Sequence, residues 1–230
     1  MTLPKVTVII PTMGRPEKLE RCVKAAQDNA NYPNFNIDVR HDDPVERNGV
    51  ALTLHGGVTT TDAPLVMYLA NDTIPQPGYL IQAVLSFLNE FGGERAPGLV
   101  ALNDGLWNGT LATFWLASKE LLKHLPDGMF FSTAYNHVGC DNELTACAKA
   151  VGCYAYEPLA RVVHDHDPAD AGSDDRLGTR RSTAVVRTGF ERAHDRGTRR
   201  FGTRLGERDD LGVTPAGWLG GSGTDDDSFG

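Results

Sequence analysis

One isolated acidic residue, Asp72, stands where an apolar stretch of the sequence gives way to a turn. The run PLVMYLAND is apolar up to Ala70 and closes on Asn71 and Asp72, after which two prolines and a glycine follow within six residues. Polar residues often end strands and Pro-Gly makes turns, so one interpretation is purely structural. A carboxylate on a rigid strand end is also a ligand that Mg²⁺ or Mn²⁺ prefers. Asp72 is therefore either a strand end or a metal ligand.

Other carboxylates occupy the same kind of position. The run FNIDVRHDD ends in Asp42 and Asp43, and the run GLVALND ends in Asp104. In an open parallel sheet, ligands bind beyond the carboxyl ends of the strands, which share one edge. We therefore expect these three residues and Asp72 to line one crevice. For Asp42 and Asp43 the alternative is a simple turn, because Pro44 follows directly.

The elements that would position these residues alternate along the chain. Strand-like runs are β-branched and apolar, whereas the helical stretches carry apolar residues on one face. The expected strands are 5–10, 35–43, 64–72, 98–104 and 110–117, with one or two more in 153–167; the expected helices are 15–30, 50–63 with a break at Gly56-Gly57, 78–92, 118–125 with Ser118 as N-cap, and 141–152. This alternation predicts an α/β, mostly parallel sheet with helices on both faces.

The composition changes after about residue 168, where Gly, Arg and Asp dominate. The segment Arg176–Arg208 holds ten arginines, no lysine and three acids, a net charge of +7, within a chain whose total is −8. The planar guanidinium of arginine suits phosphate groups, although a solvated tail or a helix docked on the acidic body is the alternative. We expect an α/β domain over 1–168, a partly helical, Arg-rich extension over 169–212, and a disordered tail over 213–230.

Composition also limits the class of protein. The four cysteines have no CxxC pair and no zinc-like spacing, so we expect free thiols. No apolar stretch approaches the roughly 20 residues that cross a bilayer, and the first ten residues lack a signal peptide's layout. We therefore expect a cytoplasmic protein without membrane insertion.

Five short stretches, taken in order, resemble one known family. They are VTVIIPTMGRPEKLERCV, the HDD that ends the second strand, ANDTIPQPGYL, GCDNEL and HDH. Over roughly residues 5–168 the chain resembles family 2-like glycosyltransferases of the GT-A (Rossmann-like) fold, and it looks most like small phage-encoded members, some of which modify DNA. The resemblance implies transfer of a sugar from a nucleotide-sugar, with a UDP-sugar favoured, to a hydroxyl group.

The resemblance also implies a divalent metal, Mn²⁺ or Mg²⁺, that bridges the two phosphates of the donor. Where the family commonly has Asp-x-Asp, this chain has Ala70-Asn71-Asp72, so Asp72 alone would bind the ion and Asn71 would contact it through water or contact the sugar. A late histidine commonly completes the site. His164 and His166 alternate with acids and face one way on an extended segment; His164 is favoured, and a solvent-exposed histidine is the alternative for either.

A catalytic base is implied in GCDNEL, where the family places an acidic pair at the start of a helix. Asp141 matches the position of the base that deprotonates the acceptor hydroxyl in an inverting displacement. Glu143 is the second candidate for this base. The alternative for Asp141 is a helix cap.

The donor contacts implied by the resemblance come from the other strand ends. Pro11, Thr12 and Arg15 would contact the nucleotide, Asp42 or Asp43 would accept a hydrogen bond from the nucleobase, and Asp104 would contact the sugar. Trp107 and Trp115 could stack on sugar or base, although an aromatic residue on a strand is more often part of the core.

The sequence says less about the acceptor of the sugar than about the donor. The Arg176–Arg208 segment favours DNA, with a hydroxymethylated base in phage DNA as the acceptor and the host cytoplasm as the location, because phosphate contacts dominate affinity for nucleic acid. A polysaccharide or protein acceptor remains an alternative. So does a non-catalytic module that binds nucleotide-sugars, which Ala70 favours. A nucleotidyltransferase is weaker, since PTMGRPEKL holds only one glycine.

Overall fold

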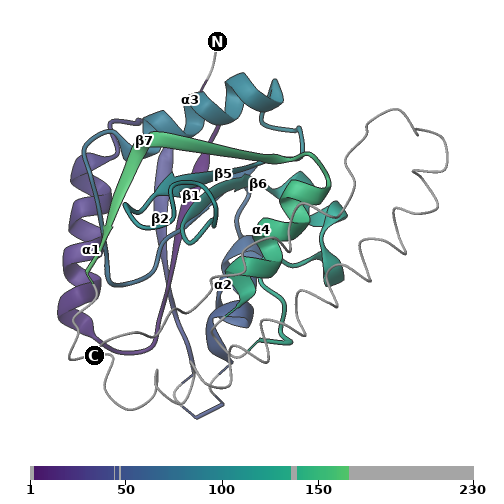
Figure 1. The fold of residues 1–230 in the computed structure, drawn as a ribbon. Helices are drawn as coiled ribbons and strands as arrows, with labels where there is room; N and C mark the ends of the chain where they lie inside the picture. The colour runs from purple at the N-terminus through teal and green to yellow at the C-terminus, as the bar shows by residue number, and fades with distance from the viewer. Residues whose placement is uncertain (1–2, 44, 47, 136–138, 166–230) are drawn as a thin grey trace, which may run out of the picture.

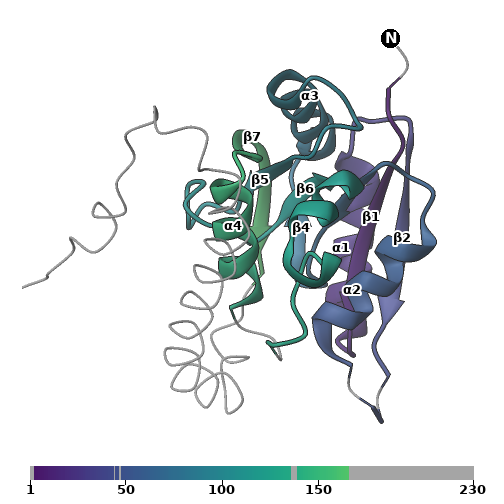
Figure 2. The same cartoon turned by 90° about the vertical axis from the view of Figure 1, so that its right-hand side faces the viewer.

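The structure is a computed structural model, and it describes residues 3–43, 45–46, 48–135 and 139–165. Figures 1 and 2 show the chain in two views at right angles. His166, the expected extension 169–212 and the expected tail 213–230 lie outside the described residues, and so does the Arg176–Arg208 segment.

The described elements alternate as the sequence pattern predicts. The strands are β1 (Val6–Thr12), β2 (Phe35–His41), β3 (Leu65–Tyr68), β4 (Thr73–Pro75), β5 (Leu99–Asn103), β6 (Trp115–Ser118) and β7 (Tyr154–His164); the α-helices are α1 (Pro16–Asn29), α2 (Gly49–Thr60), α3 (Tyr79–Phe91) and α4 (Cys140–Ala150), and two 3₁₀ helices span Lys119–His124 and Pro126–Gly128.

The strands form one mixed sheet in the order β2-β1-β3-β6-β5-β7-β4. β1 pairs in parallel with β2 and β3, and β5 pairs in parallel with β7. β6 is antiparallel to both β3 and β5, so β3 and β5 run in the same direction. The carboxyl ends of β1, β2, β3, β5 and β7 consequently share one edge of the sheet, which is the edge that the strand-end acids were expected to line.

Helices cover both faces of this sheet, as expected. α1 and α3 adjoin on one side, where the Tyr79 hydroxyl donates to the Ala26 carbonyl (3.1 Å), and α2 and α4 lie on the other (Figures 1 and 2). Because both faces are covered, the central strands are mostly apolar: Val6, Val8, Ile9 and Ile10 of β1 are fully buried. The α/β fold class is thus confirmed.

The expected break of the second helix at Gly56-Gly57 is wrong, because α2 runs unbroken from Gly49 to Thr60. Gly57 lies against β1, where a Cβ atom would come within 2.8 Å of Cγ2 of Ile9, so the glycine allows the helix to approach the strand. Gly56 has open space at its Cα.

Other local expectations are met in part. Ser118 occupies the N-cap position of the next helix as expected, but its hydroxyl accepts the Gly98 N–H (3.2 Å) and makes no capping bond, and that helix is 3₁₀. The strand expected over 110–117 begins only at Trp115. Of the one or two strands expected over 153–167, the structure has one, β7, of 11 residues. Within the described residues, no helix is long and apolar enough to cross a bilayer.

The two adjacent glycines of α2 give a matched test of this packing. Gly57→Ala should destabilise the fold by about 1–2 kcal/mol, because the overpacking against Ile9 outweighs the gain in helix propensity. Gly56→Ala should instead stabilise it by about 0.5–1 kcal/mol. Urea unfolding measures both, and equal free-energy changes for the two variants would contradict the packing argument.

Candidate active site

The carboxylate of Asp72 lies between two cationic or ionisable side chains. Its side chain is only 8% exposed, with Oδ1 3.3 Å from Nε2 of His164 and Oδ2 3.5 Å from Nη1 of Arg15. A buried carboxylate is costly unless it is paired, and these neighbours supply the compensation. Three segments that are far apart in sequence thus meet at one group: the loop after β3, the end of β7 and the turn before α1.

A tight turn after β3 brings His164 to Asp72. The amide and the hydroxyl of Thr73 both donate to the Ala70 carbonyl (3.2 and 2.7 Å), which reverses the chain into β4. β4 pairs antiparallel with the end of β7, with Thr73 opposite His164. The Asn71 side chain ties the turn to β1 by donating to Thr12 Oγ1 (2.8 Å). The sequence run after Asp72 therefore forms the strand that positions the histidine.

The imidazole of His164 is held from a second side by an aromatic ring. Its ring and that of Phe114 meet edge to face, with centroids 5.2 Å apart. The His164 side chain keeps 21% of its surface exposed, so solvent or a ligand can reach it.

Arg15 occupies the N-cap position of α1 in a left-handed conformation (φ 56°), after Gly14 (φ 86°) and before Pro16. No side chain within the described residues caps this helix end. Amides at a helix N-terminus and a guanidinium both favour a bound anion. Because the Arg15 side chain is 47% exposed, it can pair with Asp72 and also contact a phosphate in the crevice.

Asp141 and Glu143 lie in the first turn of α4, and their exposure separates them. Glu143 is buried (6% exposed), whereas Asp141 is only partly buried. Gly139, not Asp141, is the N-cap of α4, and no side-chain hydrogen bond caps the helix there. Asp141 Oδ1 instead accepts the Asn142 N–H (2.9 Å). Of the two acids, Asp141 is the one that a substrate can reach.

Tyr68, the last residue of β3, lies within electrostatic range of both candidate carboxylates, Asp72 and Asp141. Its ring packs against Trp115 and Phe131, with centroids 5.7 and 5.0 Å away. Burial raises the pKa of the Tyr68 phenol well above its ordinary value, and the charges of Cys140, Asp141 and Asp72 raise it further. Asp72 and Asp141 both lie near enough to Tyr68 for their charges to act on its phenol. No motif in the sequence indicates Tyr68; the signal available for it is its position shortly before the Asp72 turn.

The structure gives Asp42 and Asp43 a role in the turn before α2. Asp42 accepts the N–H groups of Asn48 and Gly49, both at 2.9 Å. Backbone N–H bonds from Glu46 and Val45 hold the pKa of the Asp43 carboxyl below its usual range. These bonds are those of the turn interpretation, and contact with a nucleobase stays a prediction for both residues.

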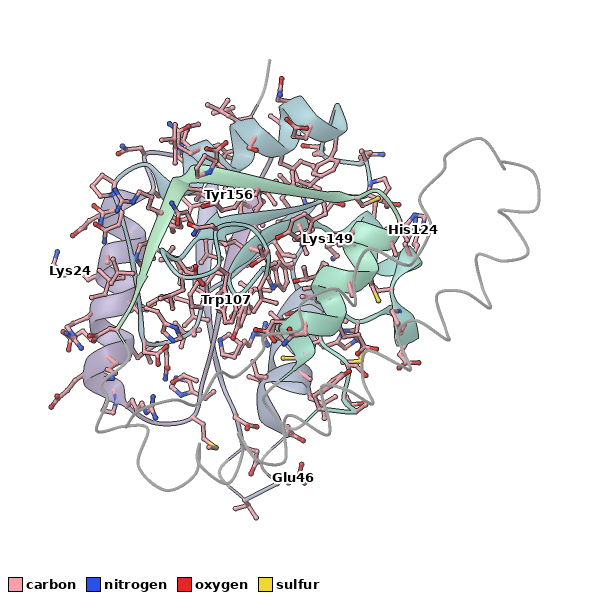
Figure 3. The ribbon with its side chains drawn as sticks, in the orientation of Figure 1. Lys24, Glu46, Trp107, His124, Lys149 and Tyr156 are labelled. Atoms are coloured by element: carbon pink, nitrogen blue, oxygen red, sulfur yellow. The ribbon has the colours of Figure 1, made fainter. Side chains whose placement is uncertain are left out.

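Most of the other residues that were expected to contact the donor are buried. Asp104 is 8% exposed: Oδ1 accepts the N–H groups of Leu106 and Trp107 (2.9 and 3.0 Å), and Oδ2 is buried with no hydrogen-bond partner among the described residues. Trp115 is fully buried and belongs to the core, so it cannot stack on a ligand; Trp107 is 49% exposed on the loop after β5 (Figure 3). Pro11 and Thr12 close β1 beside the crevice, with Thr12 buried.

The Asp72–His164 pair has a spacing that fits a shared metal ion. Two donors bound to one ion at about 2.1 Å and at a right angle lie about 3 Å apart, close to the observed 3.3 Å. Within the described residues no group of three or more His, Cys, Asp or Glu side chains forms a metal site. Any ion held by this pair would complete its coordination with water and substrate oxygens, as Mg²⁺ usually does.

Solved structures share this fold, whereas no protein-family model and no curated protein sequence matches the chain. The glucosyl-3-phosphoglycerate synthase GpgS from Mycobacterium tuberculosis, in complex with Mn²⁺, UDP and glucosyl-3-phosphoglycerate, has a TM-score of 0.59 and 17% identity over 83% of this chain and 80% of that one. The mannosyltransferase PcManGT from Pyrobaculum calidifontis, in complex with GDP-Man and Mn²⁺, has a TM-score of 0.56 and 15% identity over 73% and 59%.

S. aureus TarS is similar over a smaller part of its length. Its TM-score is 0.53 at 12% identity over 67% of this chain, which spans 35% of the TarS chain and 57% of TarS 1–349. At such identities these likenesses establish the fold alone. The chain has the GT-A fold that the sequence resemblance implied.

Proposed function

We propose that the protein is a metal-dependent, inverting glycosyltransferase that moves a sugar from a nucleotide-sugar to a hydroxyl acceptor. The carrying observation is the buried Asp72 carboxylate, which has His164 Nε2 at 3.3 Å and Arg15 Nη1 at 3.5 Å. We assign the leaving diphosphate to this group of side chains and the base for the acceptor to Asp141.

Asp72 and His164 are the residues that would hold a divalent ion, Mn²⁺ or Mg²⁺, with Asn71 beside them on the same turn. The ion, when bound, neutralises charge on the leaving diphosphate. Arg15 would bind and orient the diphosphate, because its half-exposed guanidinium lies 3.5 Å from the Asp72 carboxylate. Pro11 and Thr12 complete this nucleotide-binding turn.

Asp141 is the proposed base, since it is accessible at the start of α4 while Glu143 is buried. The acceptor hydroxyl oxygen forms a bond to the anomeric carbon as the bond from that carbon to the diphosphate oxygen breaks. The electron pair leaves with the diphosphate, and the hydroxyl proton passes to Asp141. Attack on the face opposite the leaving group inverts the anomeric centre.

The donor is proposed to be a UDP-sugar, although a GDP-sugar fits the same diphosphate contacts. GpgS is similar in fold and its structure contains UDP and Mn²⁺, and PcManGT contains GDP-Man and Mn²⁺. Asp42 and Asp43 follow β2 on the same sheet edge and are the candidates for the nucleobase, and Asp104 is the candidate for the sugar. A bound GDP would favour the PcManGT-like donor.

A non-catalytic nucleotide-sugar-binding module remains the second candidate, and Ala70 is the observation that favours it. At the first position of the Asp-x-Asp motif this chain has Ala70, so the second carboxylate of that motif is replaced by a methyl group. Slow hydrolysis of a UDP- or GDP-sugar in the presence of Mn²⁺ distinguishes an enzyme from a module, since a module leaves the donor intact.

The first test concerns the charge of Asp72. Asp72→Asn should weaken Mn²⁺ binding by about 100-fold, because the only carboxylate of the ligand pair loses its charge. Asp104→Asn removes the same charge at the same sheet edge and should leave Mn²⁺ affinity within about twofold, since metal effects follow the ligands and their direct partners. Mn²⁺ titration followed by electron paramagnetic resonance measures both variants, and equal losses would refute the ligand assignment.

The second test separates chemistry from donor binding. Asp141→Asn should lower the rate of sugar transfer by about 10²–10⁴-fold while UDP and Mn²⁺ affinities stay unchanged, because the base acts only on the acceptor. Asp62→Asn, an exposed acid paired with Lys5, is the matched control and should keep full activity. A variant at position 141 with normal turnover would remove Asp141 from the mechanism.

DNA is the proposed acceptor, through the Arg176–Arg208 segment, with a hydroxymethylated base as the reacting group. Duplex affinity of the full chain should fall steeply with salt, because cationic side chains release counterions from phosphates. Deleting residues 174–230 should flatten that slope. An unchanged slope in the deletion variant would exclude the segment, and a polysaccharide or protein acceptor would then be preferred.

A further inference from the structure

Asp165, the residue after His164, is held through three of its groups at once. Its N–H donates to the Asp72 carbonyl (2.7 Å), its carbonyl accepts from Lys18 Nζ (3.0 Å), and its carboxylate forms an ion pair with Arg21. Lys18 and Arg21 lie one turn apart on α1, so they share one face of the helix. A single helix face therefore fixes the backbone next to the candidate metal ligand.

The end of β7 has a short strand partner, and the clamp follows directly after it. β7 pairs with β5 only as far as Asn103 opposite Arg161. From Val162 to His164 its described partner is β4, a strand of three residues. The backbone bond from the Asp165 N–H to the Asp72 carbonyl extends this ladder by one residue. Beyond it, the Lys18 and Arg21 contacts to Asp165 are the described contacts that hold the chain next to His164.

We propose that Arg21, together with Lys18, positions His164 as a metal ligand by clamping Asp165 to α1. A metal-binding histidine needs a fixed orientation, and here the main-chain clamp and the Phe114 ring supply it. The same helix carries Arg15 at its N-terminus, so one rigid element sets both the diphosphate contact and the histidine. This inference rests on the proposed metal-dependent function.

A residue that positions a metal ligand affects metal affinity, whereas a residue that only stabilises the fold affects the free energy of unfolding. The Arg21 and Asp165 side chains are 56% and 35% exposed, and exposed ion pairs add little to global stability. Breaking the pair should therefore leave unfolding unchanged and weaken metal binding through His164.

The test titrates Mn²⁺ into the full chain, alone and with UDP or GDP, and follows the electron paramagnetic resonance signal of the free ion. Arg21→Met should weaken Mn²⁺ binding by about tenfold, the lower end of the effects of groups that orient metal ligands. It should also reduce the imidazole-nitrogen modulation in the Mn²⁺ spin-echo spectrum. Arg21→Lys should restore most of the affinity, because it keeps the charge opposite Asp165.

Lys24→Met is the matched control, since Lys24 lies on the same helix and pairs with Asp28 away from the crevice. It should bind Mn²⁺ like the wild type, and all variants should unfold at the same urea concentration. Asp165→Asn breaks the clamp from the other side, so its effect and that of Arg21→Met should not add in the double variant.

The outcomes separate this inference from the proposed function. A wild-type chain that binds no Mn²⁺ under any of these conditions overturns both. A wild type that binds Mn²⁺ and loses it with Asp72→Asn, while Arg21→Met matches Lys24→Met, refutes the positioning role alone. Additive effects of Arg21→Met and Asp165→Asn, or equal losses of affinity and stability, also refute it.

Discussion

The electrostatic environment of Asp72 is the constraint on which the rest of the site depends. A carboxylate with 8% of its side chain exposed cannot remain charged without partners, and it has them in His164 and Arg15. Those partners come from the end of β7 and the start of α1, so the charge is compensated only when the whole sheet has formed. The crevice is thus a product of the tertiary fold, although each of its residues stands in an ordinary loop or strand end.

The topology of the sheet explains why these ends meet. β6 runs opposite to both of its neighbours, so β5 and β7 point the same way as β1, β2 and β3 although an antiparallel strand separates the two groups. Thr12, Asp42, Asp104 and His164 consequently all lie at one edge with Asp72. The short β4 then returns along the end of β7, which converts a shared edge into direct contact between His164 and Asp72.

Sequence patterns predicted the parts that depend on local periodicity and strand ends. The alternation of apolar runs was sufficient for the α/β class and for placing Asp72 near the sheet edge, whereas His164 was predicted from the family resemblance, and the antiparallel direction of β6 was not predicted. The alternation failed where a distant contact decides the outcome: the helix runs on through Gly57, whose missing side chain lets it lie against Ile9 of β1. The role of Arg21 was also out of reach, since it arises from Asp165, 144 residues away.

The single carboxylate of the metal pair has a consequence for how the proposed enzyme would load its substrates. Ala70 supplies only its carbonyl to the turn, where Thr73 and the Cys22 thiol donate to it, and its methyl group packs beside the core. The proposed ligand pair contains one carboxylate, and the nearby Arg15 guanidinium offsets its charge. If this pair holds the ion as proposed, a divalent ion would be attracted weakly by the protein alone and strongly once a diphosphate adds its oxygens and charge. On the proposed function, metal and nucleotide-sugar then bind together, and Arg15 shifts its interaction from Asp72 toward the phosphates as they arrive.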